Sequence, residues 1–443
     1  MSLNKDFQPL TDNPPATSFY NLQIYANFYT MYESYKFLNV IFRASVIPGA
    51  LMLIWLTGII SLTVVQLCML VFLIIFVGFP LIFRYSITLQ RGILFLTFIT
   101  YPKDLDLSNP ASVGLFGTRS LNLSVLDPDV EERHDGVRIG VWHVLPLHLA
   151  KRFAKELKID MQEHDELKNT TSDDDESLDK LMPILKSEYS DVTAENEALF
   201  YERMLKLPGT IVLYLHGNTA SRGSGHRVEM YQLLRKLGCH VLSLDYRGYG
   251  DSDPVSPTEE GIVRDALTVY EYIRNVTTNP VFIWGHSLGT GVACHLCSQL
   301  SLNFKIDLPR GVILEAPFTN IRDEIRLHPF ARPFKDLPWF DLTIARPMYS
   351  NKLRFESDKH ISEFRQPVMI LHAEDDYVVP FELGYKLYRT ALDTREKTWG
   401  PVEFHRFNGV AGYGHKFLCR APELPKLAKQ FIETYRNEDF QRL

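Results

Sequence analysis

The longest apolar stretch of this chain lies near its N-terminus. No charged residue occurs between Arg43 and Arg84, and residues 62–83 are apolar at all but three positions. A helix needs roughly 20 apolar residues to cross a bilayer core of about 30 Å, so this stretch is long enough to span a membrane. It begins too far from the N-terminus for a cleavable signal peptide. We therefore predict a signal anchor with its span at about residues 62–83.

Two features around this span stay open. Residues 44–61 either extend the helix or form the second arm of a membrane hairpin. Pro48-Gly49 marks a turn near the start of the stretch, whereas its middle carries no strong turn signal, so we expect a single span. The apolar segment 92–101 is too short to cross. It either rests on the lipid surface as an interfacial helix or packs on the globular part of the chain.

Beyond residue 137, short apolar runs alternate with amphipathic stretches. The alternating run 137–144 suits an antiparallel edge strand. The later runs are nearly continuous in apolar character, which is typical of a parallel sheet covered by helices on both faces. The expected strands are 210–215, 241–244, 281–284, 312–315, one starting at 368, and 402–407, and the expected helices are 228–237, 261–275, 291–300 and 422–435.

The apolar run at 281–284 leads directly into a glycine-rich turn. Residues 281–291 read Val-Phe-Ile-Trp-Gly-His-Ser-Leu-Gly-Thr-Gly, the form of a nucleophile elbow, a strained turn that presents a serine between strand and helix. A side chain at Gly285 or Gly289 would clash where the helix leaves the strand. Ser287 is therefore the candidate nucleophile.

A serine nucleophile needs a base and an acid that orients the base. On this fold both follow the serine, the acid first. Asp376 lies in an acidic turn just past the strand that starts at residue 368, where such hydrolases carry the acid. Its neighbour Asp375 is the alternative.

The base is expected near the C-terminus. His415 lies in the Gly-rich loop 412–417, before the last helix and after the last strand. That position allows an imidazole to reach over the end of the sheet, whereas His405 falls inside the strand itself. We therefore predict His415 as the base.

The turn after the strand 210–215 supplies the fourth part of the site. It reads His216-Gly217-Asn218-Thr219, and such a turn gives one backbone N–H to an oxyanion hole while the residue after the nucleophile gives the other. Asn218 and Leu288 are the expected donors, and His216 is expected to be a buried structural imidazole. Together these parts predict an α/β-hydrolase fold.

From about Ile139 onward, the chain resembles the lysophosphatidylserine and monoacylglycerol lipases of the α/β-hydrolase-domain-containing protein 12 branch. The resemblance implies a triad of Ser287, Asp376 and His415, and a lumenal catalytic domain in the endoplasmic reticulum. The chain departs from the pattern in an acidic insertion and in the glycine before His415. The segments that carry the resemblance include Tyr214-Leu-His-Gly-Asn218, His226-Arg-Val-Glu229, Asp245-Tyr-Arg-Gly248, Trp284-Gly-His-Ser-Leu-Gly-Thr-Gly-Val-Ala293, Pro317-Phe-Thr-Asn-Ile-Arg322 and Ile370-Leu-His-Ala-Glu-Asp-Asp376.

Residues outside the triad give expectations about the substrate. The aromatic insert 321–364 is expected to form a cap, in which Trp339 and Phe340 either line an acyl-chain tunnel or attach the cap to the body. Arg222 and Arg227 follow the oxyanion loop closely, so a cation there would favour lipids that carry a phosphate. The alternative is a surface arginine that pairs with Glu229 or caps a helix.

Composition narrows the class of partner. The 443 residues carry 47 basic and 53 acidic side chains, a formal net charge of −6, so nothing favours nucleic acid. The acidic stretch 165–185 is expected to be a disordered loop and lacks the spaced ligands of an EF-hand. Cys294 and Cys297 lack a second Cys or His pair. We therefore expect no metal and no cofactor.

The predicted organisation is an N-terminal tail, an anchor, an interfacial segment and one hydrolase domain. The basic residues that flank the span are nearly balanced, and sequons occur at Asn122, Asn169 and Asn275, so the lumenal orientation comes from the resemblance alone. The predicted function is a membrane-anchored lipase of single-chain lipids. A protein S-acyl thioesterase and a non-catalytic hydrolase-fold binding protein are the alternatives. The predicted boundaries are 1–45, 46–84, 85–105 and 106–443.

Overall fold

The computed structural model describes most of the chain after residue 47. The N-terminal tail and nearly all of the predicted acidic loop 165–185, with Asn169, lie outside the described residues. The chain divides into two compact units, residues 1–82 with 333–344, and residues 83–332 with 345–443. The described residues are 42, 45, 46 and 48–438, except 129, 131–134, 160–182, 303–305, 332, 333, 336 and 338.

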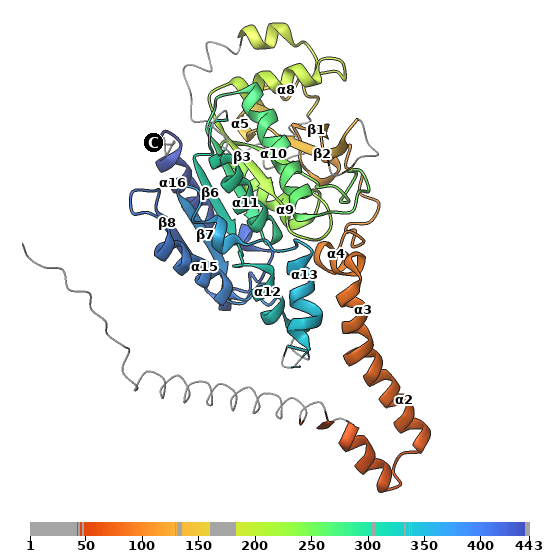
Figure 1. The fold of residues 1–443 in the computed structure, drawn as a ribbon. Coiled ribbons are helices and arrows are strands. Elements are labelled where there is room, and N and C mark those ends of the chain that lie inside the picture. Colours follow the sequence, from red (N-terminus) through yellow and green to blue (C-terminus); the bar gives the residue numbers. More distant parts are fainter. Residues whose placement is uncertain are drawn as a thin grey trace, which may run out of the picture. The chain divides into compact units, whose positions relative to one another are not determined.

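The larger unit is built on an eight-stranded sheet with the order β1-β2-β4-β3-β5-β6-β7-β8 (Figure 1). β2 pairs antiparallel with β1 and β4, and every other pair is parallel. This topology confirms the predicted α/β-hydrolase fold. The strands are β1 (Thr118–Val125), β2 (Val137–Val144), β3 (Thr210–Leu215), β4 (Cys239–Leu244), β5 (Val281–His286), β6 (Gly311–Glu315), β7 (Val368–Ala373) and β8 (Val402–Phe407).

The edge position predicted for 137–144 is wrong, although its antiparallel direction is right. β2 lies between β1 and β4, and β1 forms that edge of the sheet. β1 was not predicted because only two of its residues, Arg119 and Val125, are buried. An edge strand with a mostly half-exposed surface leaves no continuous apolar run to recognise.

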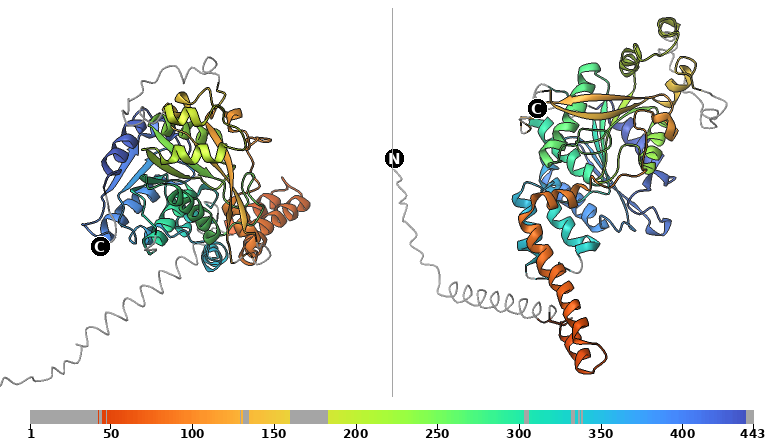
Figure 2. Two further views of the ribbon diagram at one scale, coloured as in Figure 1. Left: turned by 90° about the horizontal axis from the view of Figure 1, so that it is seen from above. Right: turned by 90° about the vertical axis from the view of Figure 1, so that its right-hand side faces the viewer.

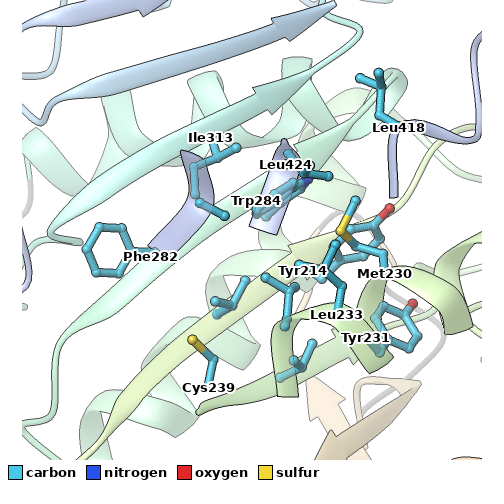
Figure 3. Close-up of a cluster of buried hydrophobic side chains, with 14 of the residues drawn as sticks. Tyr214, Met230, Tyr231, Leu233, Cys239, Phe282, Trp284, Ile313, Leu418 and Leu424 are labelled. Atoms are coloured by element: carbon cyan, nitrogen blue, oxygen red, sulfur yellow. The ribbon is translucent and has the colours of Figure 1, made fainter. Parts of the chain in front are cut away.

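Helices cover both faces of the sheet (Figure 2). α9 and α16 share one core cluster with side chains from β3, β5, β6 and β7 (Figure 3), whereas α10, α11 and α15 pack against the other face. α10 begins at Thr258, whose hydroxyl accepts the Gly261 N–H, and acidic residues occupy its first turn, as the helix dipole favours. The helices of this sandwich are α9 (Gly225–Lys236), α10 (Glu259–Val276), α11 (Leu288–Leu302), α15 (Phe381–Thr394) and α16 (Leu424–Tyr435).

Shorter helices complete the unit. α5 (Leu147–Arg152) and α8 (Glu197–Lys206) form a separate apolar cluster beside the sheet. The described parts of the predicted cap that belong to this unit include α12 (Ile321–Leu327), α13 (Arg346–Ser350) and α14 (Ser357–His360). These parts of the insert are short helices, and their role as a cap stays a prediction.

The smaller unit contains the predicted anchor. Residues 48–56 are helical and end in a turn at Gly58, whose φ is +73°. A helix built from α2 (Leu62–Leu73), the π turn Ile74–Gly78 and α3 (Phe79–Tyr85) follows. This 24-residue helix is long and apolar enough to cross a membrane. The turn, which the sequence did not signal clearly, means that the preceding residues do not extend the span.

Part of the aromatic insert packs on the π turn of this helix. The indole N–H of Trp339 donates to the Phe76 carbonyl at 3.0 Å, and the Phe334 ring lies 5.3 Å from the Phe76 ring. Pro80 has no N–H to donate to Phe76, so the helix leaves this carbonyl available to the indole. Trp339 and Phe334 thus contact the apolar helix, and Phe340 is buried. The acyl tunnel stays a prediction.

The chain after the helix belongs to the larger unit. α4 (Ile87–Phe95) buries Gln90, Leu94 and Phe95, and the residues that follow expose Phe98 and Tyr101. The apolar segment 92–101 thus packs on the hydrolase unit through its first residues. Of the two interpretations, interfacial helix or packing on the globular part, the structure favours the second.

Candidate active site

Ser287 occupies the turn between β5 and α11. Its φ of +54° lies in the left-handed region that L-residues rarely adopt, and its N–H donates to the Glu315 carbonyl at 2.9 Å. A Cβ built on Gly285 would overlap the Gly289 carbonyl, and one built on Gly289 would overlap the Leu215 carbonyl. The local sequence therefore folds into the strained elbow that the spacing predicts, with the serine at its tip.

Asp376 and His415 lie in contact. Asp376 Oδ2 is 2.7 Å from His415 Nδ1, and Asp376 Oδ1 accepts the N–H groups of Val378 and Val379 at 2.9 Å each. The neighbouring Asp375 instead accepts the Gly414 N–H at 2.9 Å. The structure thus brings Asp376, rather than Asp375, to the imidazole.

Asp376 is ionised at neutral pH. Burial acts to raise the pKa of its carboxyl, but the charge of His415 and hydrogen bonds from His372 and His415 outweigh burial and hold the pKa below its usual range. The His372 contribution was not foreseen. Its Nε2 lies 3.5 Å from Asp376 Oδ2 and 3.0 Å from the Val379 carbonyl.

The loop that carries His415 needs its glycines. Gly412 and Gly414 have φ values of +72° and +53°, which glycine adopts without strain.

His286 Nε2 lies 2.8 Å from the His415 carbonyl. Burial and the nearby His415 lower the pKa of His286 to about 3, so its ring is neutral and Nε2–H donates to that carbonyl. His405, the histidine set aside above, pairs with Glu403.

Sequence reasoning missed the positioning role of His286. Its only local signal is its place next to the serine in the elbow, where many residues are possible. The contact with His415 joins positions 129 residues apart, so no nearby pattern could indicate it.

The predicted oxyanion loop lies against the elbow. A Cβ built on Gly217 would come within 3.2 Å of the Ser287 Cβ, and Leu288 is the first residue of α11, where helical N–H groups lack intrahelical partners. Among the described residues, the N–H groups of Asn218 and Leu288 have no hydrogen-bond acceptor. Both amides are thus free to bind an oxyanion.

His216 is buried beneath this loop. Its Nδ1 lies 2.6 Å from the Gly217 carbonyl, and burial lowers the pKa of His216 well below its ordinary value. The neutral ring therefore stabilises the turn, as predicted for a buried structural imidazole.

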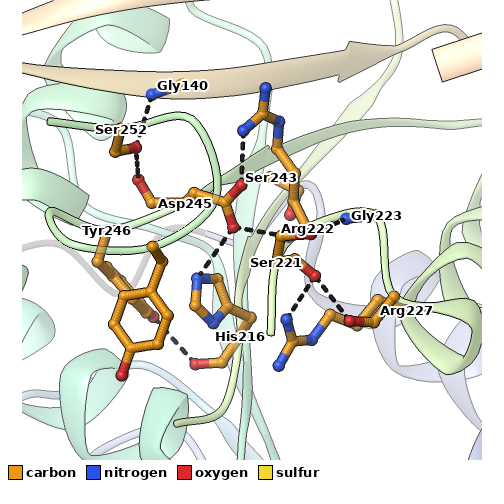
Figure 4. A network of polar contacts seen from close by, with 12 residues as sticks. Gly140, His216, Ser221, Arg222, Gly223, Arg227, Ser243, Asp245, Tyr246 and Ser252 are labelled. Atoms are coloured by element: carbon orange, nitrogen blue, oxygen red, sulfur yellow. Dashed lines mark hydrogen bonds and ion pairs between the residues drawn. The ribbon is translucent and has the colours of Figure 1, made fainter. Parts of the chain in front are cut away.

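Both arginines expected at the head group are buried, and Figure 4 shows them within a network of polar contacts. Arg222 is fully buried, and its guanidinium donates to Asp245 and Asp251 at 2.6 Å each. Arg227 is 1 % exposed and donates to the Thr219 carbonyl at 2.6 Å. The expectation that they read a phosphate is therefore wrong, and so is the alternative pairing with Glu229, which binds Arg420.

The error has a physical cause. Asp245 ends β4, and Asp251 lies in the loop that follows it. Burial raises the pKa of Asp245, while Arg222 acts to lower it. A buried guanidinium needs such partners, and these come from a loop more than twenty residues away that the local sequence does not reveal.

One cluster has the residue types of a metal site. The ligating atoms of Glu259, His295 and His360 lie within 4.8 Å of one another. The two imidazoles are stacked, however, with centroids 4.3 Å apart and planes at 13°. Stacked rings direct their nitrogen lone pairs side by side and not toward a common point. Glu259 already accepts the N–H groups of Arg354 and Phe355. We therefore assign no ion to this cluster.

Comparison with known proteins adds to this geometry. The profile of a family described as "Alpha/beta hydrolase family" matches residues 212–415. The lysophosphatidylserine lipase ABHD12 of Danio rerio is 35% identical over 361 residues, which cover 81% of this chain and 81% of that protein. The Mus musculus protein of the same name is 37% identical over 369 residues, covering 83% and 79%. Protein ABHD12B of Homo sapiens is 36% identical over 241 residues, covering 53% and 64%.

Proposed function

The chain belongs to the family of the lysophosphatidylserine lipase ABHD12, within the alpha/beta hydrolases, and from this premise we propose that it hydrolyses single-chain lipids with Ser287, Asp376 and His415. It is a hydrolase of lipid esters. The substrates that we propose are lysophosphatidylserine and monoacylglycerol. The observation that carries the proposal is the 2.7 Å contact between Asp376 and His415, together with a serine held in the left-handed turn of an elbow.

In the proposed mechanism His415 is the general base. Its Nδ1–H donates to the ionised Asp376, so Nε2 is the nitrogen that accepts the Ser287 proton as the hydroxyl attacks the ester carbonyl. The backbone N–H groups of Asn218 and Leu288 bind the oxygen that becomes negative. Protonated His415 then donates to the leaving oxygen of glycerol or its phosphodiester.

Hydrolysis of the acyl-enzyme repeats these steps with water. His415 takes a proton from water, the hydroxide attacks the Ser287 ester, and the fatty acid leaves as Ser287 regains its proton. Asp376 stays ionised throughout, because its pKa lies below its usual range. These steps need no metal and no organic cofactor.

We also propose that the helix of residues 62–85 anchors the enzyme in the membrane of the endoplasmic reticulum, with the hydrolase unit in the lumen. Its length and apolar composition support a single span. An anchor of this kind suits a substrate that resides in lipid.

The test is Ser287→Ala in the full-length protein. We expect loss of hydrolysis of both lipids and of fluorophosphonate labelling, with an unchanged melting temperature, because only one oxygen is removed. Ser298→Ala is the matched control, since Ser298 lies on α11, the helix that follows Ser287, and its hydroxyl donates to Glu363. An acylated peptide assayed in parallel separates lipase from thioesterase activity. Retained labelling in Ser287→Ala would contradict the assignment of the nucleophile.

A further inference from the structure

The predicted oxyanion loop is held by the chain that follows the apolar helix. The side-chain amide of Asn218 donates to the Leu94 carbonyl at 2.8 Å. The Ala220 N–H donates to the Ile99 carbonyl at 3.0 Å. The Tyr249 hydroxyl donates to the Phe95 carbonyl and lies 3.4 Å from the Asn218 carbonyl. We name residues 94–99 the brace. Two of its carbonyls accept hydrogen bonds from the oxyanion loop, and a third accepts from Tyr249, which contacts that loop.

The loop needs such support. Ala220 has a φ of +56°, a left-handed conformation that its Cβ disfavours and that persists only where surrounding contacts fix it. The glycine at 217 adds no side chain that could restrain the turn. The contacts of the brace therefore supply restraint that the sequence of the loop does not.

The first residues of the brace are well packed. Leu94 and Phe95 are buried, and the Phe95 ring packs edge-on against Phe355 at 6.3 Å. One turn earlier, the buried Gln90 donates to the Phe83 carbonyl and accepts from Asn351. The carbonyls of Leu94 and Phe95 are therefore held in place by buried side chains.

We propose that the brace positions the oxyanion hole, by holding the Asn218 side chain so that the Asn218 backbone N–H points at the developing oxyanion. This inference rests on the function proposed above. The Asn218 amide side chain and Phe95 act through the backbone of the loop and are positioning groups. Because the brace follows the apolar helix by only a few residues, the chain that leaves the helix is part of the catalytic architecture.

The first test is Asn218→Ala in full-length protein in detergent micelles. The variant keeps the backbone N–H but loses the contact with Leu94. We expect kcat to fall about 10- to 100-fold with KM within twofold, less than the roughly 10²–10³ lost when an oxyanion donor is removed outright. The affinity of a long-chain boronic acid, whose serine adduct is a tetrahedral anion, should fall by the same factor. A purely structural contact would lower the melting temperature but leave kcat and this affinity unchanged.

The matched control is Gln232→Ala. Gln232 also donates from a side-chain amide to a backbone carbonyl, that of Gly114, at 2.8 Å, but it does not contact the loop. We expect its kcat and boronic acid affinity to equal those of the wild type.

A second pair of variants perturbs the brace from its own side. Phe95→Leu loosens the packing against Phe355, and Phe153→Leu loosens an equally buried ring that packs on Phe200 at 5.2 Å, away from the loop. We expect both to lower the melting temperature, but only Phe95→Leu to lower kcat and boronic acid affinity together.

The inference is overturned if Asn218→Ala and Phe95→Leu keep the wild-type kcat at a temperature where both are folded. It is also overturned if kcat falls while boronic acid affinity does not. Failure of the proposed function has a different signature, which is lipid hydrolysis by Ser287→Ala.

Discussion

Replacing Asp376 by asparagine changes one atom of the proposed triad, and the contacts around that atom decide the result. Oδ1 of Asp376 accepts two backbone N–H groups, from Val378 and Val379, at 2.9 Å each. An asparagine keeps these bonds only with its amide oxygen at that position. Its NH₂ group then occupies the place of Oδ2, 2.7 Å from His415 Nδ1.

An NH₂ group donates and cannot accept, so Nδ1 of His415 must become the acceptor. The ring proton then resides on Nε2, and this tautomer cannot take the proton of Ser287. Rotating the amide would place its NH₂ against two N–H groups and leave both unsatisfied, at a cost of about 1–3 kcal/mol each. The structure therefore enforces the unproductive tautomer.

We expect kcat to fall by about 10⁴, the loss known for neutralised triad acids in other enzymes, which is about 5.4 kcal/mol of transition-state stabilisation. The assay is steady-state hydrolysis of monoacylglycerol in micelles, with the rate of fluorophosphonate labelling as a second readout of acylation. KM should change little, because Asp376 does not contact the lipid.

The control is Asp375→Asn. Its side chain accepts the Gly414 N–H, and an asparagine oxygen can still do so, so we expect less than a tenfold loss. A larger loss in Asp375→Asn than in Asp376→Asn would refute the assignment of the acid, and a loss below tenfold in Asp376→Asn would refute the tautomer argument.

Three further predictions concern stability and topology. Burial raises the pKa of Glu315 from its ordinary 4.5 to about 7, so the folded protein holds a proton there that the unfolded chain loses, and stability falls as pH rises between these values. The test compares the wild type with Glu315→Gln, whose amide oxygen still accepts from Trp284, in urea titrations. The unfolding free energy of the variant minus that of the wild type should increase by about 3 kcal/mol from pH 4.5 to pH 7.5. A difference that does not change with pH would contradict this. Arg222→Met should cost about 3–5 kcal/mol of stability, because Asp245 loses its buried partner, and should change the kcat/KM ratio of lysophosphatidylserine to monoacylglycerol less than threefold. A lumenal hydrolase unit predicts a glycosidase-sensitive mass shift that Asn122→Gln reduces, and digestion of this unit by protease in sealed microsomes would refute that orientation.

The parallel strands could be predicted because burial on both faces leaves a continuous apolar run. β3 and β8 have the predicted bounds, and β4 and β6 begin only one or two residues earlier than predicted. The candidate site was accessible for a related reason. Its residues follow the carboxyl ends of these strands, and parallel strands bring those ends to one edge of the sheet.

Features that depend on distant residues could not be predicted. The partners of Arg222 come from the loop after β4, and the partner of the His415 carbonyl is His286 on another strand. Trp339 and its acceptor in the π turn, the Phe76 carbonyl, lie 263 positions apart. A local pattern carries no information about such pairs, so a buried arginine was read as an exposed one.

Several contacts that hold the residues of the proposed triad use a main-chain group on at least one side. The Ser287 N–H donates to the Glu315 carbonyl, His286 holds the His415 carbonyl, and Asp375 holds the Gly414 N–H. A main-chain group keeps its hydrogen-bonding capacity whatever side chain is attached. Such a site tolerates extensive substitution around it as long as the backbone path is kept. The positions that tolerate least substitution should therefore be the turn glycines and the few side chains that contact the backbone.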